Sequence, residues 1–135
     1  MTTRPPWFYK QAGVIPYRRV GTGFEILLIT AKRGRWIIPK GIIDPGETPI
    51  ESACKEAYEE AGVEGRPDPQ VIGKYEYRKW GATCTVQVFG LEVTRMLESW
   101  PEAEMRQRQW FGKEEAFNMV EKPGLKEIIR NFSPP

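Results

Sequence analysis

The helix that begins near Pro49 has both ends marked by residue type, and it limits the possible folds more than any other segment. Thr48 is suited to cap this helix, Pro49 takes the first helical position, where no N–H group is missed, and Glu51 completes a capping box. Gly62 supplies the stop at the other end. We therefore expect a helix from about Pro49 to Ala61.

Apolar runs on both sides of this helix predict β-strands. Ala12–Val20 and Phe24–Ala31 are rich in branched apolar residues and are joined by a turn with two glycines, which indicates a β-hairpin. A second hairpin is expected from residues 71–79 and 83–93, turning at Trp80-Gly81, with Gly90 as a candidate bulge. Shorter elements are expected as strands at 36–38 and 107–111 and as helices at 114–120 and 125–132. The pattern predicts a mixed α/β fold in one domain, residues 1–135.

The chain has 135 residues and contains no histidine. That absence excludes a Ser-His-Asp triad, a Cys-His pair and an HExxH zinc site. Carboxylates or lysines must therefore supply any acid–base chemistry. The two cysteines, Cys54 and Cys84, have no partner at metal-ligand spacing and are expected to be structural thiols.

Charge is unevenly distributed along the chain, although the net charge is only +2. Residues 1–40 hold eight Lys or Arg and one acidic residue, whereas residues 41–70 hold eight acidic residues and two basic ones. A basic segment beside an acidic one suits the binding of a polyanion through a bridging metal ion, the alternative being two solvated faces that never meet. The absence of a long basic stripe does not favour a nucleic acid as partner.

No apolar run approaches the roughly 20 residues that span a bilayer, and the first ten residues lack the apolar core of a signal peptide. We therefore expect a cytoplasmic protein that does not use a membrane. The sequence makes no prediction of oligomeric state.

Three glutamates, Glu56, Glu59 and Glu60, share one arc of the expected helix. An apolar stripe beside them seats the helix on the core: Ile50, Ala53, Cys54, Ala57 and Ala61. Like charges at these spacings repel, and Lys55, four residues from both Glu51 and Glu59, cannot neutralise three of them. Clustered carboxylates select a hard divalent cation such as Mg²⁺ or Mn²⁺. A solvated helix face without a metal ion is the alternative.

Residues 41–63 resemble the Nudix box, whose pattern is Gly, five residues, Glu, seven residues, Arg-Glu, a hydrophobic residue, any residue, Glu-Glu, any residue, Gly and a hydrophobic residue. Six residues match at the required spacing: Gly41, Glu47, Glu56, Glu59, Glu60 and Gly62. At roughly 7% for each residue type, the chance probability is on the order of 10⁻⁷, which excludes coincidence. Lys55 departs from the pattern, because the family has arginine there, and an ammonium cannot reproduce its two-pronged contacts.

The resemblance implies a mixed β-sheet sandwiched between helices and a Mg²⁺-dependent hydrolysis of a phosphoanhydride bond by activated water. Carried over by position, Glu56 and Glu60 would be metal ligands, and Glu59, or else Glu56, would take a proton from the water. The backbone carbonyl of Lys40 or Gly41 would complete the metal shell. This division among the glutamates varies within the family.

Outside the box, the chain looks most like the diphosphoinositol polyphosphate phosphohydrolases and the diadenosine polyphosphate hydrolases. The similarity rests on Trp36, Pro39-Lys40-Gly41, the run Arg106-x-Arg108-x-Trp110-Phe111, and Lys122-Pro123. Gln11 departs from the inositol subfamily, which tends to have a basic residue there. Candidates to bind a small polyphosphorylated substrate are Lys10, Arg33, Arg35, Lys40, Arg106 and Lys122.

Two other functions stay open at this point. One is a Nudix pyrophosphatase for nucleotide sugars, dinucleotide cofactors or nucleoside triphosphates. The other is a module that keeps the Nudix fold and binds a ligand without turnover, which the change at Lys55 leaves open and the complete set of box glutamates opposes.

Overall fold

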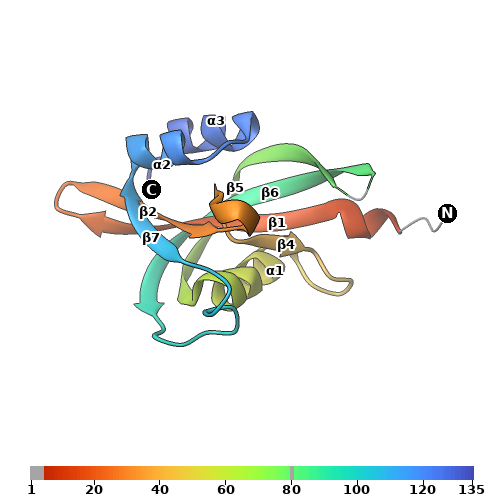
Figure 1. The fold of residues 1–135 in the computed structure, drawn as a ribbon, viewed down its shortest axis with the longest axis horizontal. Coiled ribbons are helices and arrows are strands. Elements are labelled where there is room, and N and C mark those ends of the chain that lie inside the picture. Colours follow the sequence, from red (N-terminus) through yellow and green to blue (C-terminus); the bar gives the residue numbers. More distant parts are fainter. Residues whose placement is uncertain (1–4, 80) are drawn as a thin grey trace.

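The structure is a computed structural model that describes residues 5–79 and 81–135. Its elements are η1 (Pro6–Tyr9), β1 (Lys10–Val20), β2 (Gly23–Thr30), η2 (Lys32–Gly34), β3 (Trp36–Ile37), β4 (Lys40–Ile42), α1 (Pro49–Glu56), η3 (Ala57–Ala61), β5 (Val63–Lys79), β6 (Ala82–Met96), β7 (Arg108–Gly112), α2 (Lys113–Met119) and α3 (Pro123–Asn131). In this part of the chain a seven-stranded sheet has α1 on one face and α2 with α3 on the other (Figure 1). The expected mixed sheet between helices is confirmed.

The strands of the sheet follow the order β3-β2-β1-β6-β5, with β4 paired to β1 and β7 paired to β2. β1 and β6 run parallel, and the other pairs are antiparallel. β2 pairs with β1 only from Tyr17 to Val20, so β4 can pair with residues 11–13 at the start of the same strand. This arrangement brings Lys40 and Gly41 to the end of the sheet where β1 begins.

The central strands bury side chains on both faces, so they have runs of branched apolar residues rather than strict alternation. On one face, Ile15 and Leu28 belong to a core that includes residues of α2 and α3. On the other, Val14 and Leu27 pack in a core with the helix alanines. Ala53, Ala57 and Ala61 are fully buried there, which confirms the apolar stripe that seats the helix.

Both expected hairpins form, but the second is longer than its hydrophobic pattern indicated. β5 begins at Val63 rather than Val71, and continues through Pro67. β5 is an edge strand, where a missing N–H group need not break a ladder hydrogen bond. Of the expected turn, Gly81 has a φ of 71°, and Trp80 lies outside the described residues.

The expectation of a bulge at Gly90 is wrong. The irregularity lies in β5 opposite it, where Pro67 and Val71 pair with Leu91 and Phe89 and leave extra residues between them. Gly90 itself pairs regularly with Ile15 of β1.

The remaining short elements are confirmed to within two residues, namely β3, β7, α2 and α3. β4 was not among the expected elements. No helix in the described ranges, 5–79 and 81–135, is both long and apolar enough to cross a membrane.

Candidate active site

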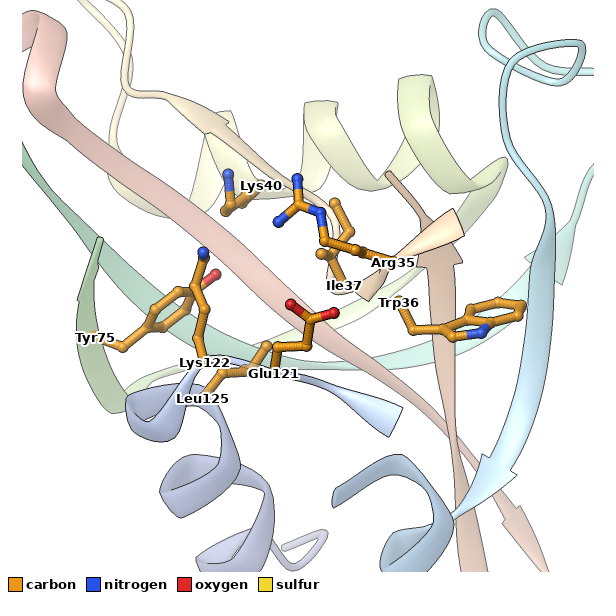
Figure 2. Close-up of a pocket in the computed structure, with 8 residues that line it drawn as sticks. All are labelled: Arg35, Trp36, Ile37, Lys40, Tyr75, Glu121, Lys122 and Leu125. Atoms are coloured by element: carbon orange, nitrogen blue, oxygen red, sulfur yellow. The ribbon is translucent and has the colours of Figure 1, made fainter. Parts of the chain in front are cut away.

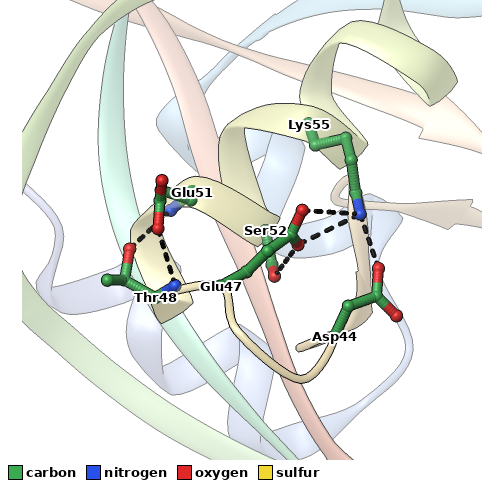
Figure 3. A network of polar contacts seen from close by, with 6 residues as sticks. All are labelled: Asp44, Glu47, Thr48, Glu51, Ser52 and Lys55. Atoms are coloured by element: carbon green, nitrogen blue, oxygen red, sulfur yellow. Dashed lines mark hydrogen bonds and ion pairs between the residues drawn. The ribbon is translucent and has the colours of Figure 1, made fainter.

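The amino end of α1 is built as the capping residues predict (Figure 3). Thr48 Oγ1 accepts a hydrogen bond of 3.1 Å from the Glu51 amide, and Glu51 Oε1 accepts one of 2.8 Å from the Thr48 amide. These two bonds satisfy backbone N–H groups that a helix start leaves without partners. Glu51 is therefore a structural residue of the helix start.

Lys55 contacts the loop before the helix rather than the glutamates one turn away. Its ammonium group lies 2.5 Å from Asp44 Oδ2 and 3.0 and 3.2 Å from the two Glu47 oxygens (Figure 3). Ser52 Oγ donates a further bond of 2.6 Å to Glu47. Of the two glutamates four residues away from Lys55, Glu51 is engaged in the cap. Lys55 instead holds the loop of the box against the helix.

The helix ends in one π-helical turn, η3, which carries Glu59 and Glu60. Gly62 then takes a left-handed conformation with a φ of 65° and ends the helix as expected. A π turn accommodates an extra residue in one turn of the helix, and such turns occur frequently at functional sites. The glutamates therefore depart from the regular α-helical spacing assumed from sequence.

The carboxyl end of η3 is covered by the segment 97–108, which leads into β7. Four consecutive carbonyl groups accept hydrogen bonds from this segment. The Glu59 carbonyl accepts from the Glu102 amide (3.1 Å), and the Glu60 carbonyl accepts from Trp100 Nε1 (3.1 Å). The Ala61 carbonyl accepts from Arg108 Nη1 (2.9 Å), and the Gly62 carbonyl accepts from the Leu97 amide (2.9 Å). The Arg108 guanidinium also stacks 3.9 Å from the Trp100 ring centroid. These donors satisfy carbonyl groups that a helix end leaves without partners and fix the position of Glu59 and Glu60.

Glu60 is a buried carboxylate, with 8% of the residue exposed. Its Oε1 accepts a hydrogen bond of 3.0 Å from the Lys40 amide, and its Oε2 lies 3.4 Å from Arg106 Nη2. Arg106 also donates to Glu102 (2.7 Å) and to the Thr30 carbonyl (2.9 Å). The Glu60 carboxylate is therefore held from two sides, by β4 and by the segment before β7.

Glu56 lies against Gly41. A Cβ atom built on Gly41 would lie 2.3 Å from Glu56 Cδ, so no larger residue fits at this position without moving the carboxylate. The glycine of the Nudix box is thus required here for close approach. Gly41 and Lys40 lie side by side on β4 and contact the two glutamates in turn.

Both glutamates bind protons more tightly than free carboxyl groups do. Burial raises the pKa of Glu56 to about 8, and the negative charges of Glu60 and Glu59 add to this effect. Burial also raises the pKa of Glu60 to about 7, although Arg106 and the hydrogen bond from Lys40 lower it in part. Each carboxylate is therefore costly to ionise in the absence of a further cation.

These carboxylates suit a divalent cation by their chemistry. Oxygen ligands and clustered negative charge are what Mg²⁺ and Mn²⁺ prefer. As the side chains stand in the part of the chain that is described, no three acidic or cysteine side chains converge closely enough to hold a metal ion. Glu60 is near enough to raise the pKa of Glu56, and the two fit as ligands that a cation would draw together.

Three of the predicted substrate-binding residues come together at one pocket, which is also lined by Tyr75 (Figure 2). The side-chain ends of Arg35, Lys40 and Lys122 point into this space in Figure 2. Burial lowers the pKa of Lys122, and the positive charges of Arg35 and Lys40 add to the shift. The sequence did indicate these three cations, although they are far apart along the chain.

The other three predicted substrate-binding residues lie outside this pocket. Lys10 is exposed at the start of β1, and Arg33 is exposed in η2 with a φ of 65°. Arg106 lies at the glutamates, where three acceptors engage its guanidinium. Neither Lys10 nor Arg33 lines the pocket that holds Arg35, Lys40 and Lys122.

Four residues of the site region were not singled out for it by the sequence. Trp100 and Arg108 cap η3. Tyr75 lines the pocket that holds Arg35, Lys40 and Lys122, which we call the cationic pocket, and Tyr77 lies beside it. Arg108 was noted only as part of a family-like run. No local signal marks these residues, because each acts through partners more than 30 residues away, such as Glu60 for Trp100.

The family model described as "NUDIX domain" matches residues 8–132. Nudix hydrolase 21, chloroplastic, from Arabidopsis thaliana is 36% identical over 92% of this chain, which spans 66% of that relative's length. Mouse diphosphoinositol polyphosphate phosphohydrolase 3-alpha is 36% identical over 97% of this chain and 82% of its own length.

Among solved structures, a C. elegans Ap4A hydrolase binary complex has a TM-score of 0.70 at 23% identity, covering 90% of this chain and 93% of that one. This likeness concerns the fold. The family model extends over nearly the whole chain, and the Arabidopsis relative is itself named as a Nudix hydrolase. The chain therefore belongs to the Nudix hydrolase family.

Proposed function

We propose that this protein hydrolyses a phosphoanhydride bond in a small polyphosphorylated molecule, with water as the attacking group and Mg²⁺, or else Mn²⁺, as cofactor. The observation that carries the proposal is the pair of neighbouring carboxylates, the partly buried Glu56 and the buried Glu60, held against Gly41 and the Lys40 amide. Burying two like charges together is unfavourable without a compensating cation. A structural helix face would leave them in solvent.

Cleavage of a phosphoanhydride develops negative charge on the phosphoryl oxygens and on the leaving phosphate. The bound cation would neutralise this charge and favour attack by water. Glu56, Glu60 and a backbone carbonyl of Lys40 or Gly41 are the groups we assign to hold it. Neither histidine nor a covalent nucleophile is required, which agrees with the composition.

Glu59 is the residue we assign to take the proton from the attacking water, with Glu56 as the second candidate. Glu59 lies on the π turn, partly exposed, and its carbonyl is fixed by the Glu102 amide at 3.1 Å. Its carboxylate is thus carried on a restrained backbone while remaining open to solvent. A general base must lie within hydrogen-bond reach of the water that it deprotonates.

For the substrate, we propose a diphosphoinositol polyphosphate or a dinucleoside polyphosphate. The name of the mouse relative supports the first, at 36% identity over 82% of that protein. The candidate phosphate-binding residues remain Lys10, Arg33, Arg35, Lys40, Arg106 and Lys122, of which Arg35, Lys40 and Lys122 share one pocket. A cytoplasmic location is also a proposal, since the plant relative is named as chloroplastic.

A substrate panel tests this function. Purified protein is incubated with diphosphoinositol polyphosphates, dinucleoside polyphosphates, nucleotide sugars and nucleoside triphosphates, with Mg²⁺ or with EDTA, and released phosphate and nucleotide are measured. We expect turnover of one of the first two classes with Mg²⁺ only. Binding of these compounds with no turnover under any metal condition would instead establish a non-catalytic module.

A further inference from the structure

The indole of Trp100 contacts the backbone of the residue that we assign as a metal ligand. Its Nε1 donates a hydrogen bond of 3.1 Å to the Glu60 carbonyl, from a segment 40 residues further along the chain that connects β6 to β7 (Figure 1). The Glu60 carboxylate is held separately, by the Lys40 amide at 3.0 Å and by Arg106 at 3.4 Å. Glu60 is therefore restrained at its carbonyl group as well as at its carboxylate.

The Trp100 ring packs directly on Gly62, the last residue of the helix. A Cβ atom built on Gly62 would lie 2.7 Å from two atoms of the ring and 2.8 Å from Arg108 Nη1. Glycine is thus required here both for the left-handed φ of 65° and for the space that the indole occupies. The missing side chain lets the indole approach the backbone closely enough to reach the Glu60 carbonyl.

Arg108 fixes the indole from its other side. Its guanidinium lies 3.9 Å from the centroid of the Trp100 ring. Its Nη1 donates to the Ala61 and Gly62 carbonyls at 2.9 and 3.1 Å, and its Nη2 donates to the Leu97 carbonyl. Arg108 is the first residue of β7 and so belongs to the sheet. The indole is thereby held between the sheet and the π turn.

We propose that Trp100 is a positioning residue for catalysis, and that its hydrogen bond, supported by Arg108, holds the π turn where Glu59 can act as general base and Glu60 as metal ligand. A misplacement of about 1 Å in such groups can cost on the order of 100-fold in rate. The residues that line the cationic pocket do not include Trp100, so its loss should alter metal binding and kcat rather than substrate binding. The inference rests on the proposed roles of the two glutamates.

Trp110 provides a matched control for the Trp100 hydrogen bond. Its ring packs against the core that seats α1, and the Arg18 guanidinium lies 4.4 Å from the ring centroid. Among the described residues, none accepts a hydrogen bond from the buried Trp110 Nε1. Replacing this indole by phenylalanine therefore changes aromatic packing without removing a hydrogen bond.

Metal binding in the absence of substrate tests the positioning role. Mn²⁺ is the probe, and its dissociation constant is measured by isothermal titration calorimetry for the wild-type protein, Trp100→Phe and Trp110→Phe. Phenylalanine keeps an aromatic ring at each position and removes the indole N–H group. Trp100→Phe should weaken Mn²⁺ binding about tenfold, which corresponds to the effect of one hydrogen bond. Trp110→Phe should bind Mn²⁺ as the wild type does.

Steady-state kinetics separates positioning from substrate binding. With saturating Mg²⁺ and the substrate that the panel identifies, Trp100→Phe should lower kcat about tenfold or more and leave KM within about twofold of the wild-type value. Trp110→Phe should keep both values. Thermal unfolding of each variant checks that the protein is folded at the assay temperature.

Arg108→Lys is a second variant, which carries the same comparison if Trp100→Phe does not fold. It keeps the positive charge, but an ammonium group does not reproduce the planar contacts of the guanidinium with three carbonyl groups. We expect weaker Mn²⁺ binding and a lower kcat, again with KM nearly unchanged.

The positioning role and the proposed catalysis can fail separately. Hydrolysis by an enzyme whose Mn²⁺ affinity and kcat are equal in Trp100→Phe and Trp110→Phe overturns the positioning role alone, and so does a change confined to KM. Trp100-dependent Mn²⁺ binding by a protein that cleaves no substrate in the panel overturns the proposed catalysis alone. A wild-type protein that binds no Mn²⁺ overturns both.

Discussion

The Lys40 amide donates a hydrogen bond of 3.0 Å to Glu60 Oε1, while the ammonium group of the same residue donates one of 3.0 Å to Tyr77. One residue of the short strand β4 thus connects the buried Glu60 carboxylate to the cationic pocket. Gly41, the next residue, makes room for Glu56. The position of β4 against β1 therefore determines the geometry of both parts of the site.

Gly41→Ala should reduce kcat by about 100-fold, because a new Cβ atom would lie 2.3 Å from Glu56 Cδ and displace the carboxylate. The control is Gly23→Ala, where the nearest atom would be 3.8 Å away and no glycine conformation is required. Steady-state kinetics with Mg²⁺ measures both. Full activity in Gly41→Ala would show that the position of Glu56 is unimportant.

Arg106→Met should lower the free energy of unfolding by about 2–4 kcal/mol, because it leaves the buried Glu60 carboxylate without its cation. The two side chains are 19% and 11% exposed. Arg130→Met is the control, since its ion pair with Glu127 is 58% and 59% exposed and should contribute less than about 1 kcal/mol. Urea unfolding measures the difference, and equal losses in the two variants would contradict the role of Arg106.

Lys55→Arg should leave kcat/KM unchanged, although it restores the family's residue. Lys55 binds Asp44 and Glu47, and a guanidinium can pair with the same carboxylates. Lys55→Met should release the loop and cost about 0.5–1 kcal/mol in urea unfolding, as expected for partly exposed ion pairs. An increase of activity in Lys55→Arg would instead mean that lysine limits the enzyme.

The metal-free protein should become less stable as the pH rises. A carboxyl group whose pKa is raised in the folded protein binds its proton more tightly there than in the unfolded chain. Its stabilising effect is therefore complete below the ordinary pKa of 4.5 and is lost as the pH rises through the pKa of the folded state. Those folded values are about 7 for Glu60 and about 8 for Glu56. In EDTA, the free energy of unfolding should fall between about pH 5 and pH 9.

Glu56→Gln should reduce the slope of this pH dependence, because the glutamine does not titrate. Glu114→Gln, at an exposed position of α2, should keep the wild-type slope. Urea unfolding at each pH provides the measurement. The explanation fails if stability is constant over this range or increases with pH.

Local rules made several features of the site predictable. The capping box at Thr48 and the stop at Gly62 depend on neighbours within a few residues, and both appear as expected. The two apolar runs of the first hairpin likewise determine β1 and β2. The box spacing identified the glutamates because their separation along one helix is a property of sequence alone.

Features that depend on distant partners were not predictable. The partners of Lys55 are Asp44 and Glu47 of the preceding loop, which its position along the helix did not indicate. The π turn is stabilised by donors from Trp100 and Arg108, far along the chain. The pairing of β4 with β1 is also non-local, so sequence patterns did not indicate it.

The most direct test of the central assignment is the Mg²⁺-dependent kcat/KM of Glu59→Gln and Glu60→Gln, measured on the diphosphate substrate that the panel identifies. Each substitution should lower it by about 100-fold or more, since Glu59 supplies the general base and Glu60 a metal ligand. The control Glu114→Gln should keep wild-type activity. Unchanged activity in both Glu59→Gln and Glu60→Gln would contradict catalysis by these glutamates.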